Sequence, residues 1–273
     1  MRVSRGSGSR YPAPMSPSTV DRAGDVPALL AAAATTGDAG ALLTFYDDAT
    51  GERTELSTEA LGAWVARTAN LLADGCGLGH GGRAAVLLPP HWQTAAALLG
   101  SWAAGLSVDH RSWATAGLPL LGAGSAGRFE VAFVTRERQR SMLEDVPEAG
   151  HRFLLDLAGP VAGLAPPPGF RDFLDEARRH PGELPAPVQL RDADPASVDG
   201  TSFGQWGHLA QETAVALGIR PGDRVLVDAA AHDHPAIWLL APLAAGASVV
   251  LCANLDPSTI PARTVAERVT RVL

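Results

Sequence analysis

The sequence predicts an α/β fold of two similar doubly wound halves, with mainly parallel sheets covered by helices. The first observation is a gap-free internal repeat, in which Arg83–Val108 returns 141 positions later as Arg224–Val249. The second is the order of the elements, because strands alternating with helices favour parallel sheets with right-handed crossovers. The third is that the expected strands are apolar on both faces, which is typical of sheets covered by helices on each side.

The repeat aligns residues that shape the backbone as well as apolar ones. Its pairs include Gly77 with Gly218, Gly81 with Gly222, Gly105 with Gly246, and His91 with His232. A period of about half the chain indicates two copies of one supersecondary unit, whereas solenoid repeats run about 20–50 residues.

The elements before the first copy are short. Residues 1–24 are polar and rich in Pro and Ser, which predicts a disordered tail, and either Met1 or Met15 fits as the translation start. Val26–Thr35 predicts a short helix. A hairpin and a helix follow, because Ala41–Tyr46 and Arg53–Leu56 flank a Gly-containing loop and Ser57 or Thr58 is a suitable N-cap.

Both copies read as strand, helix and strand. In the first copy we expect a strand over Ala84–Leu88, a helix over His91–Ala104 and a strand over Leu106–Val108. Further along we expect, in order, strand Phe129–Val134, helix Arg136–Glu144, strand Phe153–Leu157, helix Phe170–Arg179, helix Gln205–Leu217, the second copy, and a final helix over Pro261–Leu273.

Composition shifts divide the chain into four parts. We expect a disordered tail over 1–24, a first subdomain over 25–160, a linker with a short helix over 161–195, and a second subdomain over 196–273. The linker is placed where Pro and Gly become frequent on both sides of a charged helix.

Composition also excludes several classes of function. All 22 basic residues are Arg, so no lysine is present to form a Schiff base, bind phosphate or act as a base. The net charge is −7 without a basic cluster, which argues against nucleic-acid binding. The apolar runs are shorter than the ~18 residues of a membrane span, and the N-terminus does not read as a signal peptide. We therefore expect a cytoplasmic protein that does not enter membranes.

The first copy resembles a known enzyme family. The run from Gly82 to Pro89, followed by a helix that ends at Ala103-Ala104-Gly105, is similar to the first subdomain of adenylate-forming enzymes, such as acyl-CoA synthetases. In the second copy, Leu239–Leu243 and Gly246–Leu251 resemble the second subdomain. The resemblance covers about residues 42–271 and is closest to a short, actinobacterial-type group of truncated proteins without an assigned function.

The departures from that family bear on activity. The family carries a phosphate loop that ends in Pro-Lys-Gly, whereas the corresponding segment here, Asp194–Gly204, is shortened and has no lysine. The family's adenine- and ribose-binding motifs and its small C-terminal domain correspond to positions beyond Leu273. The resemblance therefore implies an N-terminal part of the enzyme without its ATP-handling parts, and we predict no catalytic residue and no cofactor.

Five residues are weak candidates for ligand binding. His91, Trp92 and Asp228 lie where strands of the two copies end, which is where an α/β fold opens its ligand crevice. The resemblance implies that His232 or His234 lies beside the acyl pocket. A helix-entry role for these histidines stays the alternative.

Two further motifs lack the context they need. His232-Asp233-His234 with Asp228 has the residue types of a metal site, but a further convergent ligand is not evident, so we predict no metal. Asp109-His110 is the comparable pair elsewhere. Gly122–Gly127 matches G-x-G-x-x-G, but a strand follows the match where a helix is needed, which indicates a loop.

Two hypotheses of function remain open. The favoured one is a catalytically degenerate acyl-CoA synthetase-like domain that binds a small acyl ligand or a partner protein. The alternative is half of a split adenylate-forming ligase that a second polypeptide completes. The apolar helix over His232–Ala245 and the stripe of Val265, Val269 and Val272-Leu273 need cover, so we also expect a homodimer or a protein partner that contacts the second subdomain. The alternative is that the stripe packs onto the second sheet of its own chain.

Overall fold

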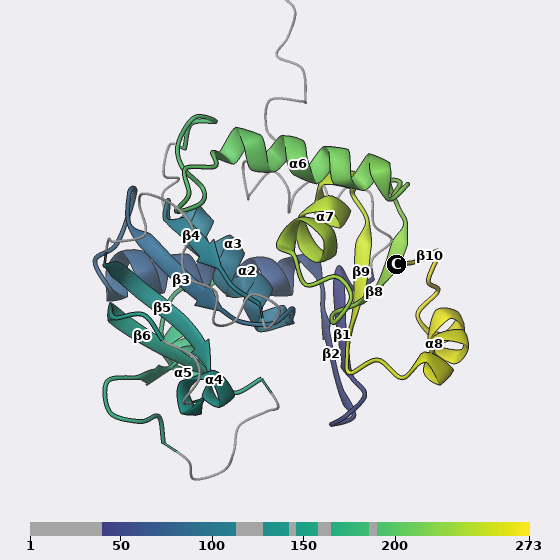
Figure 1. The fold of residues 1–273 in the computed structure, drawn as a ribbon, viewed down its shortest axis with the longest axis horizontal. Helices are drawn as coiled ribbons and strands as arrows, with labels where there is room; N and C mark the ends of the chain where they lie inside the picture. Colours follow the sequence, from purple (N-terminus) through teal and green to yellow (C-terminus); the bar gives the residue numbers. More distant parts are fainter. Residues whose placement is uncertain (1–39, 113–127, 142–145, 158–164, 186–189) are drawn as a thin grey trace, which may run out of the picture.

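Two five-stranded sheets stand side by side with helices packed between them. The structure, a computed structural model, describes residues 40–112, 128–141, 146–157, 165–185 and 190–273. One sheet has the strand order β10-β8-β9-β1-β2 and the other β4-β3-β5-β6-β7. Among the described strands, β1 and β2 form the antiparallel pair, and every other pairing is parallel. The predicted fold class is confirmed (Figure 1).

The strands are short and evenly spread along the described chain. Their bounds are β1 Leu43–Asp47, β2 Glu52–Leu56, β3 Arg83–Leu87, β4 Ser107–His110, β5 Phe129–Thr135, β6 Ala149–Leu155, β7 Arg171–Asp172, β8 Arg224–Asp228, β9 Ser248–Ala253 and β10 Arg271–Val272.

The helices include two π-helical segments and one 3-10 segment. Their bounds are α2 Thr58–Asn70, η2 Leu71–Gly75, α3 Trp92–Ala103, α4 Arg136–Arg140, α5 Phe173–Arg178, α6 Phe203–Ala216, η4 Ala236–Leu240, α7 Ala241–Ala245, η5 Pro257–Thr259 and α8 Ile260–Ala266. No helix in the described part of the chain is long and apolar enough to cross a membrane.

The two copies of the repeat form equivalent units in different sheets. In the first unit, β3 pairs with β4 so that Arg83 lies opposite Ser107, and in the second, β8 pairs with β9 so that Arg224 lies opposite Ser248. These partners are related by the same 141-residue offset, so the sequence repeat is also a repeat of strand register. The prediction of two equivalent βαβ units is confirmed.

The glycines that the repeat aligns share one backbone conformation. Gly105 and Gly246 follow α3 and α7 with φ of 80° and 68°, and Gly81 and Gly222 have φ of 87° and 80°. A side chain at positive φ is costly, so glycine is favoured at these turns. The amide of Gly81 donates to the carbonyl of Gly105, and the amide of Gly222 donates to that of Gly246 in the same way.

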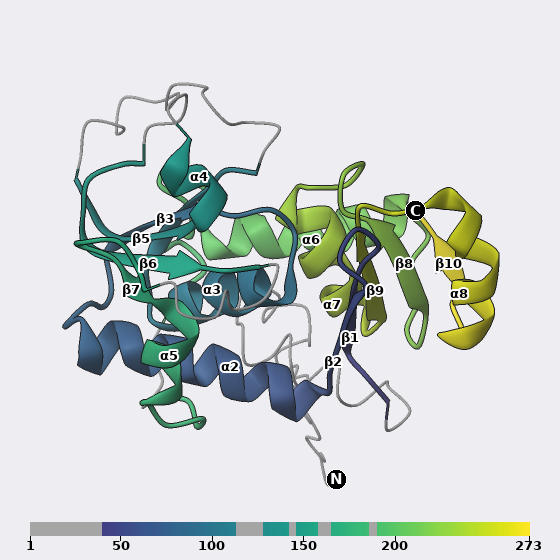
Figure 2. The ribbon, with the colours of Figure 1, turned by 90° about the horizontal axis from the view of Figure 1, so that it is seen from below.

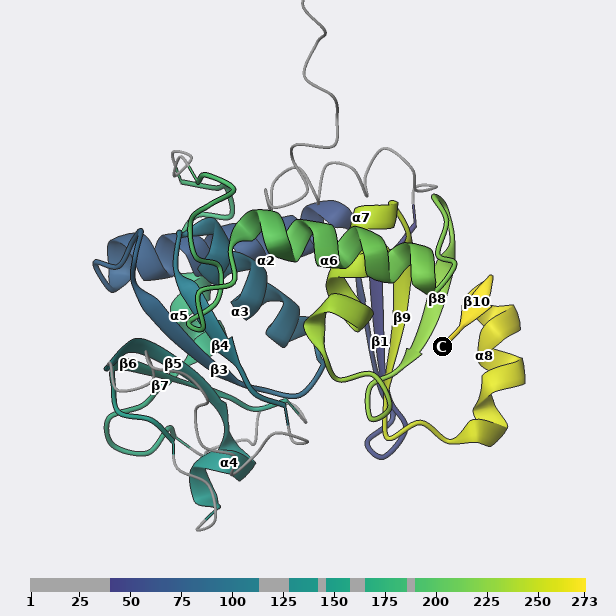
Figure 3. The same ribbon diagram turned by 45° about the horizontal axis from the view of Figure 1, so that its top comes forward.

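One hydrophobic core links both sheets. It contains strand residues such as Val86 and Phe133 of one sheet together with Phe45 and Val227 of the other. Helices α2, α3, α6 and α7 supply the residues between them, and α6 runs from beside β4 to beside β8 (Figures 2 and 3). The two sheets thus share one large core, and two smaller clusters, which include Leu87 and Val250, lie apart from it.

The N-terminal hairpin joins the sheet of the second unit. Strand β1 runs parallel to β9, and Leu43 lies opposite Val249 across about 200 residues of sequence. The expected division of the chain near residue 160 stays a prediction, but membership of the sheets does not follow it, because β1 and β2 precede that point.

The expected final helix is wrong in its second half. Helix α8 ends at Ala266, Arg268 turns into the left-handed region with φ of 52°, and β10 pairs with β8. The amide of Val269 donates to the carbonyl of Thr264, which is the six-residue closure of a Schellman turn. The predicted tail over 1–24, the helix over Val26–Thr35 and the motif over Gly122–Gly127 lie outside the described residues.

Candidate functional site

A polar cluster lies where the carboxyl ends of β4 and β8 come together. We call His110, Ser112, Trp206, Asp233 and His234 the inter-unit cluster. The hydroxyl of Ser112, just after β4, donates to the carboxylate of Asp233, in the loop after β8. The imidazole of His234 stacks on the indole of Trp206 from α6, with ring centroids 5.6 Å apart and planes 14° from parallel. The cluster therefore joins residues of both units.

The histidines of the cluster are held neutral near pH 7. Burial lowers the pKa of His110 to about 4, although the carbonyl of Leu88, 3.2 Å from its Nε2, opposes that effect. Burial also lowers the pKa of His234, against the opposing charge of Asp233. A buried imidazole loses hydration that its charged form needs. The two rings thus present uncharged aromatic surface beside one carboxylate.

Four of the five predicted site residues have roles in helix entry or loop geometry. His91 accepts the amide of Gln93 as the N-cap of α3, and Asp228 accepts the amide of Ala230. The amide of His232 donates to the carbonyl of Asp228. His234 belongs to the inter-unit cluster and also accepts the amide of Ala236 at the start of η4. A ligand role for all five stays a prediction.

His91 and Trp92 lie deep between the sheets. The His91 ring is 4.2 Å from that of Phe45 in β1, and the Trp92 ring is 5.6 Å from that of Trp64 in α2. Burial lowers the pKa of His91 to about 3, so it is neutral under ordinary conditions. Nε2 of His91 and Nε1 of Trp92 are buried without a hydrogen-bond partner in the described structure.

Sequence reasoning missed Ser112 and Trp206. Asp109-His110 was noted only as a second acid–histidine pair, although its place at the end of an expected strand was a usable signal. Trp206 packs against the hydrophobic core, and its Nε1 also donates to the hydroxyl of Ser197 at 2.6 Å. In the part of the chain that the structure describes, no group of three or more His, Cys, Asp or Glu side chains could hold a metal ion.

The segment at the expected phosphate-loop position, Asp194–Gly204, folds into a closed hairpin. Pro195 and Ser202 form a bridge, and Ser197 bridges to Val108 of β4. The indole of Trp102 donates to the carbonyl of Ala196 at 2.9 Å. The amides of the segment donate within the protein: Ala196 and Ser197 to Thr201, Val198 to Val108, Gly200 to Ser197, Thr201 to the carboxylate of Asp199, Ser202 to the side chain of Gln205, Phe203 to Asp194, and Gly204 to Asp192.

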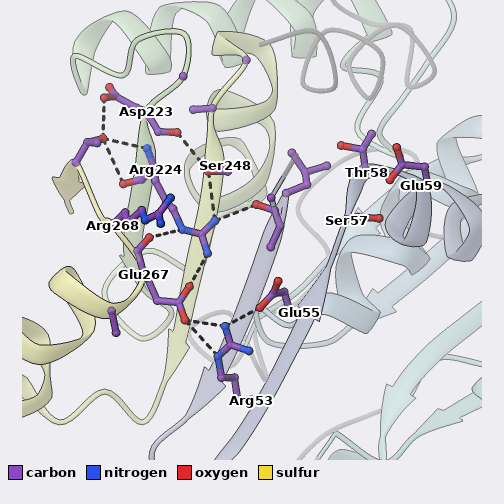
Figure 4. A pocket seen from close by; sticks show the side chains of 18 residues that line it. Arg53, Glu55, Ser57, Thr58, Glu59, Asp223, Arg224, Ser248, Glu267 and Arg268 are labelled. Carbon is purple, nitrogen blue, oxygen red and sulfur yellow. Dashed lines mark hydrogen bonds and ion pairs between the residues drawn. The ribbon is translucent and has the colours of Figure 1, made fainter. Parts of the chain in front are cut away.

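A cavity of about 590 Å³ lies at the opposite edge, where β8 and β9 begin. Its lining includes Arg53, Arg224, Ser248 and Glu267 (Figure 4). Hydrogen bonds from Tyr46, Arg224 and Arg53 overcome the effect of burial and lower the pKa of Glu267 to about 2. The Glu267 carboxylate is 2.7 Å from the Arg224 guanidinium and 2.8 Å from that of Arg53.

Comparison with known proteins decides the family. No family model matches the chain. A "TIGR03089 family protein" of Mycobacterium tuberculosis (strain ATCC 25618 / H37Rv) is 38% identical over 247 residues, which cover 86% of this chain and 91% of that protein. The chain belongs to the TIGR03089 family.

Solved structures place this TIGR03089 protein in a wider fold group. An acyl-CoA synthetase of Brucella canis matches with a TM-score of 0.64 at 19% identity, over 89% of this chain and 46% of the synthetase. Acetoacetyl-CoA synthetase from Streptomyces lividans matches with 0.65 at 18%, over 92% and 42%. The N-terminal domain of FACL13 from Mycobacterium tuberculosis matches with 0.63 at 16%, over 90% and 62%.

These likenesses confirm the resemblance seen in the sequence. The TIGR03089 chain has the α/β fold of acyl-CoA synthetase N-terminal regions. It spans about half the length of the two synthetases, which makes it truncated relative to them. At these identities the likeness establishes the fold, and activity has to be argued from the residues themselves.

Proposed function

We propose that this TIGR03089 protein is a catalytically degenerate acyl-CoA synthetase-like domain that binds a small acyl ligand or a partner protein. Its fold is that of an adenylate-forming enzyme, whereas the segment at the phosphate-loop position has no lysine, and most of its backbone amides donate within the protein. That segment carries the proposal.

Phosphate loops bind through unpaired backbone N–H groups that converge on the anion. In Asp194–Gly204 most of those donors are engaged by carbonyl and side-chain acceptors of the same chain, and the carboxylate of Asp199 accepts one of them. Opening the segment for a triphosphate would break the hairpin and its contacts with Val108 and Trp102. A buried donor or acceptor left unpaired costs about 1–3 kcal/mol, so several together oppose nucleotide binding.

The inter-unit cluster supports the acyl-ligand form of the proposal. It lies at the carboxyl ends of parallel strands, where α/β folds bind ligands. The resemblance implies an acyl pocket beside His232 or His234. Of the two, His234 is the neutral imidazole stacked on Trp206, which is suited to contact an apolar chain. The split-ligase alternative is less well supported, because an enzyme half would need this closed phosphate-loop segment in working form.

The partner-protein form has support of its own. Val265 on α8 is 80% exposed and Val272 on β10 is 47% exposed, and both belong to the second unit's sheet or the helix that leads into it. Light scattering at micromolar concentrations should then give a mass above the 28.3 kDa of one chain, or a pull-down should recover a stable partner. A mass of one chain without a partner would remove this form of the proposal.

Thermal unfolding tests the ligand form directly. ATP with Mg²⁺ should leave the melting temperature unchanged, whereas a fatty acid or its CoA thioester should raise it in a saturable way. A ligand at 1,000 times its Kd stabilises a protein by about 4 kcal/mol, which is easily measured. His234→Ala should lose the acyl response, and His208→Ala, an exposed histidine on α6, should retain it.

Two outcomes would contradict the proposal. A concentration-dependent rise with ATP and Mg²⁺ would show that the closed segment still handles nucleotide. Equal acyl responses in the His234 and His208 variants would remove the inter-unit cluster from the ligand site.

A further inference from the structure

The cavity at the amino-terminal edge of β8 and β9 has a charge arrangement that the proposed function does not use. It lies where these strands begin, so it is separate from the inter-unit cluster at the carboxyl ends of β4 and β8. Its volume of about 590 Å³ falls within the ~300–1,000 Å³ range of small-molecule sites. Four segments enclose it: β2 with the start of α2, residues 40–42, the starts of β8 and β9, and the turn from α8 to β10.

The acidic side chains of the lining are engaged by neighbours. Glu267 is bound by Arg224, Arg53 and Tyr46, and Glu55 is paired with Arg53 at 2.6 Å. Asp223 accepts the hydroxyl of Thr270 at 2.7 Å. The hydroxyl of Ser57 holds the pKa of Glu59 below its usual value at the start of α2. Arginines therefore compensate Glu267, Glu55 and Asp223, the last through Arg271 at 3.7 Å, whereas Glu59 keeps its negative charge at the α2 side of the lining.

Arg268 differs from the other two arginines of the lining. Arg53 and Arg224 are bound to Glu267, but among the described residues no hydrogen bond or ion pair involves the guanidinium of Arg268. Figure 4 draws Arg268 beside the bonded network, with Ser57, Thr58 and Glu59 on the other side of the view. An arginine fork without a carboxylate partner is suited to bind an oxyanion with two parallel N–H bonds.

The backbone at Arg268 adds an independent observation. Its φ of 52° places it at the position after a helix end where glycine is preferred, because a Cβ is strained there. The backbone alone thus favours glycine at this position, which is occupied by an exposed arginine. That side chain lines the cavity.

We propose that this cavity binds a small ligand bearing a carboxylate or phosphate group, with Arg268 as the residue that pairs with the oxyanion. Arg53 and Arg224 hold Glu267 in place and shape the floor, while the hydroxyls of Ser57, Thr58 and Ser248 offer neutral hydrogen-bonding groups for the rest of the ligand.

The test compares three proteins: the wild type, Arg268→Gly and Arg220→Ala. Arg220 is an exposed arginine outside the cavity lining and serves as the matched control. Melting temperatures are measured in sodium phosphate and in sodium acetate, each against sodium chloride at equal ionic strength. The two anions distinguish a phosphate ligand from a carboxylate ligand.

The wild type and Arg220→Ala should show a saturable rise of a few degrees, on the order of 2–8 °C, in at least one of the two anions. Arg268→Gly should melt at a higher temperature than the wild type in chloride, since glycine relieves the strain at positive φ, and should lose the saturable response. Phosphate also stabilises proteins by exclusion from their surface, which acts equally on all three.

An equal, unsaturated response in all three proteins would overturn the proposal, as would the absence of any difference from chloride in the wild type. If Arg268→Gly does not fold, Arg268→Ala tests the same loss of the guanidinium. The proposed function is tested with ATP, acyl compounds and the His234→Ala variant, which concern the other edge of the sheet. A negative result with phosphate, acetate and Arg268→Gly is therefore distinguishable from failure of the proposed function.

Discussion

The two repeated units differ in the stretch between strand and helix, while their strands and turns agree. Strands β3 and β8 end at equivalent positions, Leu87 and Asp228. Helix α3 then begins at Trp92, whereas η4 begins only at Ala236, three positions later than the repeat would place it. The second unit therefore has a longer loop and a shorter helix within the same total length, which leaves the register of the return strand unchanged.

The difference in loop length places the histidines of the two units in different surroundings. The short loop of the first unit places His91 in the core as an N-cap, 2% exposed and against Phe45. The long loop of the second unit instead carries Asp233 and His234 to the inter-unit cluster. The His91 and His232 that the sequence aligns are thus not equivalent in role, since His234 performs the capping that His91 performs in the first unit. A longer loop between strand and helix therefore moves the polar residues that it carries, while the pairing of the strands stays the same.

The largest expected effect concerns the strand-start arginines, which the two units hold differently. The side chain of Arg224 pairs with buried Glu267, whereas the amide of Arg83 is bound by Glu130. Glu267→Gln leaves Arg224 without its anion and should destabilise the protein by about 3 kcal/mol, at the low end for broken buried pairs because Arg53 is partly exposed. Urea unfolding at pH 7 measures it.

Glu130→Gln is the matched change in the first unit. It keeps an oxygen to accept the Arg83 amide and should cost about 1 kcal/mol or less. The pKa of Glu267 is lowered to about 2 by its partners, so its contribution is fully present above about pH 4.5 and disappears as pH falls towards 2. Two results would contradict this account. One is an equal loss of unfolding free energy in the two variants, and the other is a wild type and a Glu267→Gln protein that lose stability in the same way as pH falls.

The second prediction concerns the closeness of helix packing in the two units. Gly100 in α3 corresponds to Ala241 in α7, and a Cβ at Gly100 would lie 2.5 Å from Cβ of Thr68 in α2. Gly100→Ala should therefore destabilise the protein by about 2–3 kcal/mol through overpacking, although alanine is the better helix former. Denaturant unfolding measures the loss.

Ala241→Gly gives the opposite exchange. It should cost about 1 kcal/mol from helix propensity, with a further small term for the lost methyl contacts. A Gly100→Ala protein that is as stable as the wild type would mean that α2 and α3 separate easily, and that the two units pack more alike than their residues indicate.

The expected effect that is smallest at pH 7 is a difference in acid response between the two helix-entry histidines. Burial lowers the pKa of His91 to about 3, below the ordinary value of 6.5 that the unfolded chain retains. The unfolded state then binds the proton first, so stability falls as pH drops from about 6.5 to about 3, by up to about 1.4 kcal/mol per pH unit. His91→Asn, which keeps an N-cap, should flatten that part of the stability–pH curve.

His234→Asn should change the same curve less, because His234 as a whole residue is exposed and burial lowers its pKa less than that of His91. Stability from denaturant midpoints between pH 4 and 7 provides the measurement. If the two substitutions alter the curve equally, the distinction between a core histidine and a cluster histidine fails.

The sequence by itself determined the fold class, the two units and their strand register. Each of these depends on local signals: glycines where φ must be positive, such as Gly105 and Gly246, and apolar runs that only a covered sheet accommodates. The absence of lysine likewise followed from composition alone. Because both copies carry the same local signals, aligning them was enough to predict that they fold alike.

Only the tertiary structure decided the sites. The hairpin joins β9 across about 200 residues, Ser112 meets Asp233 across 121 residues, and Arg53 meets Glu267 across 214. Such contacts are set by which faces pack together, and local propensity carries little information about that. The closure of Asp194–Gly204 on β4 and the guanidinium of Arg268, which has no partner among the described residues, are of the same kind, since whether a donor is engaged depends on neighbours distant in sequence.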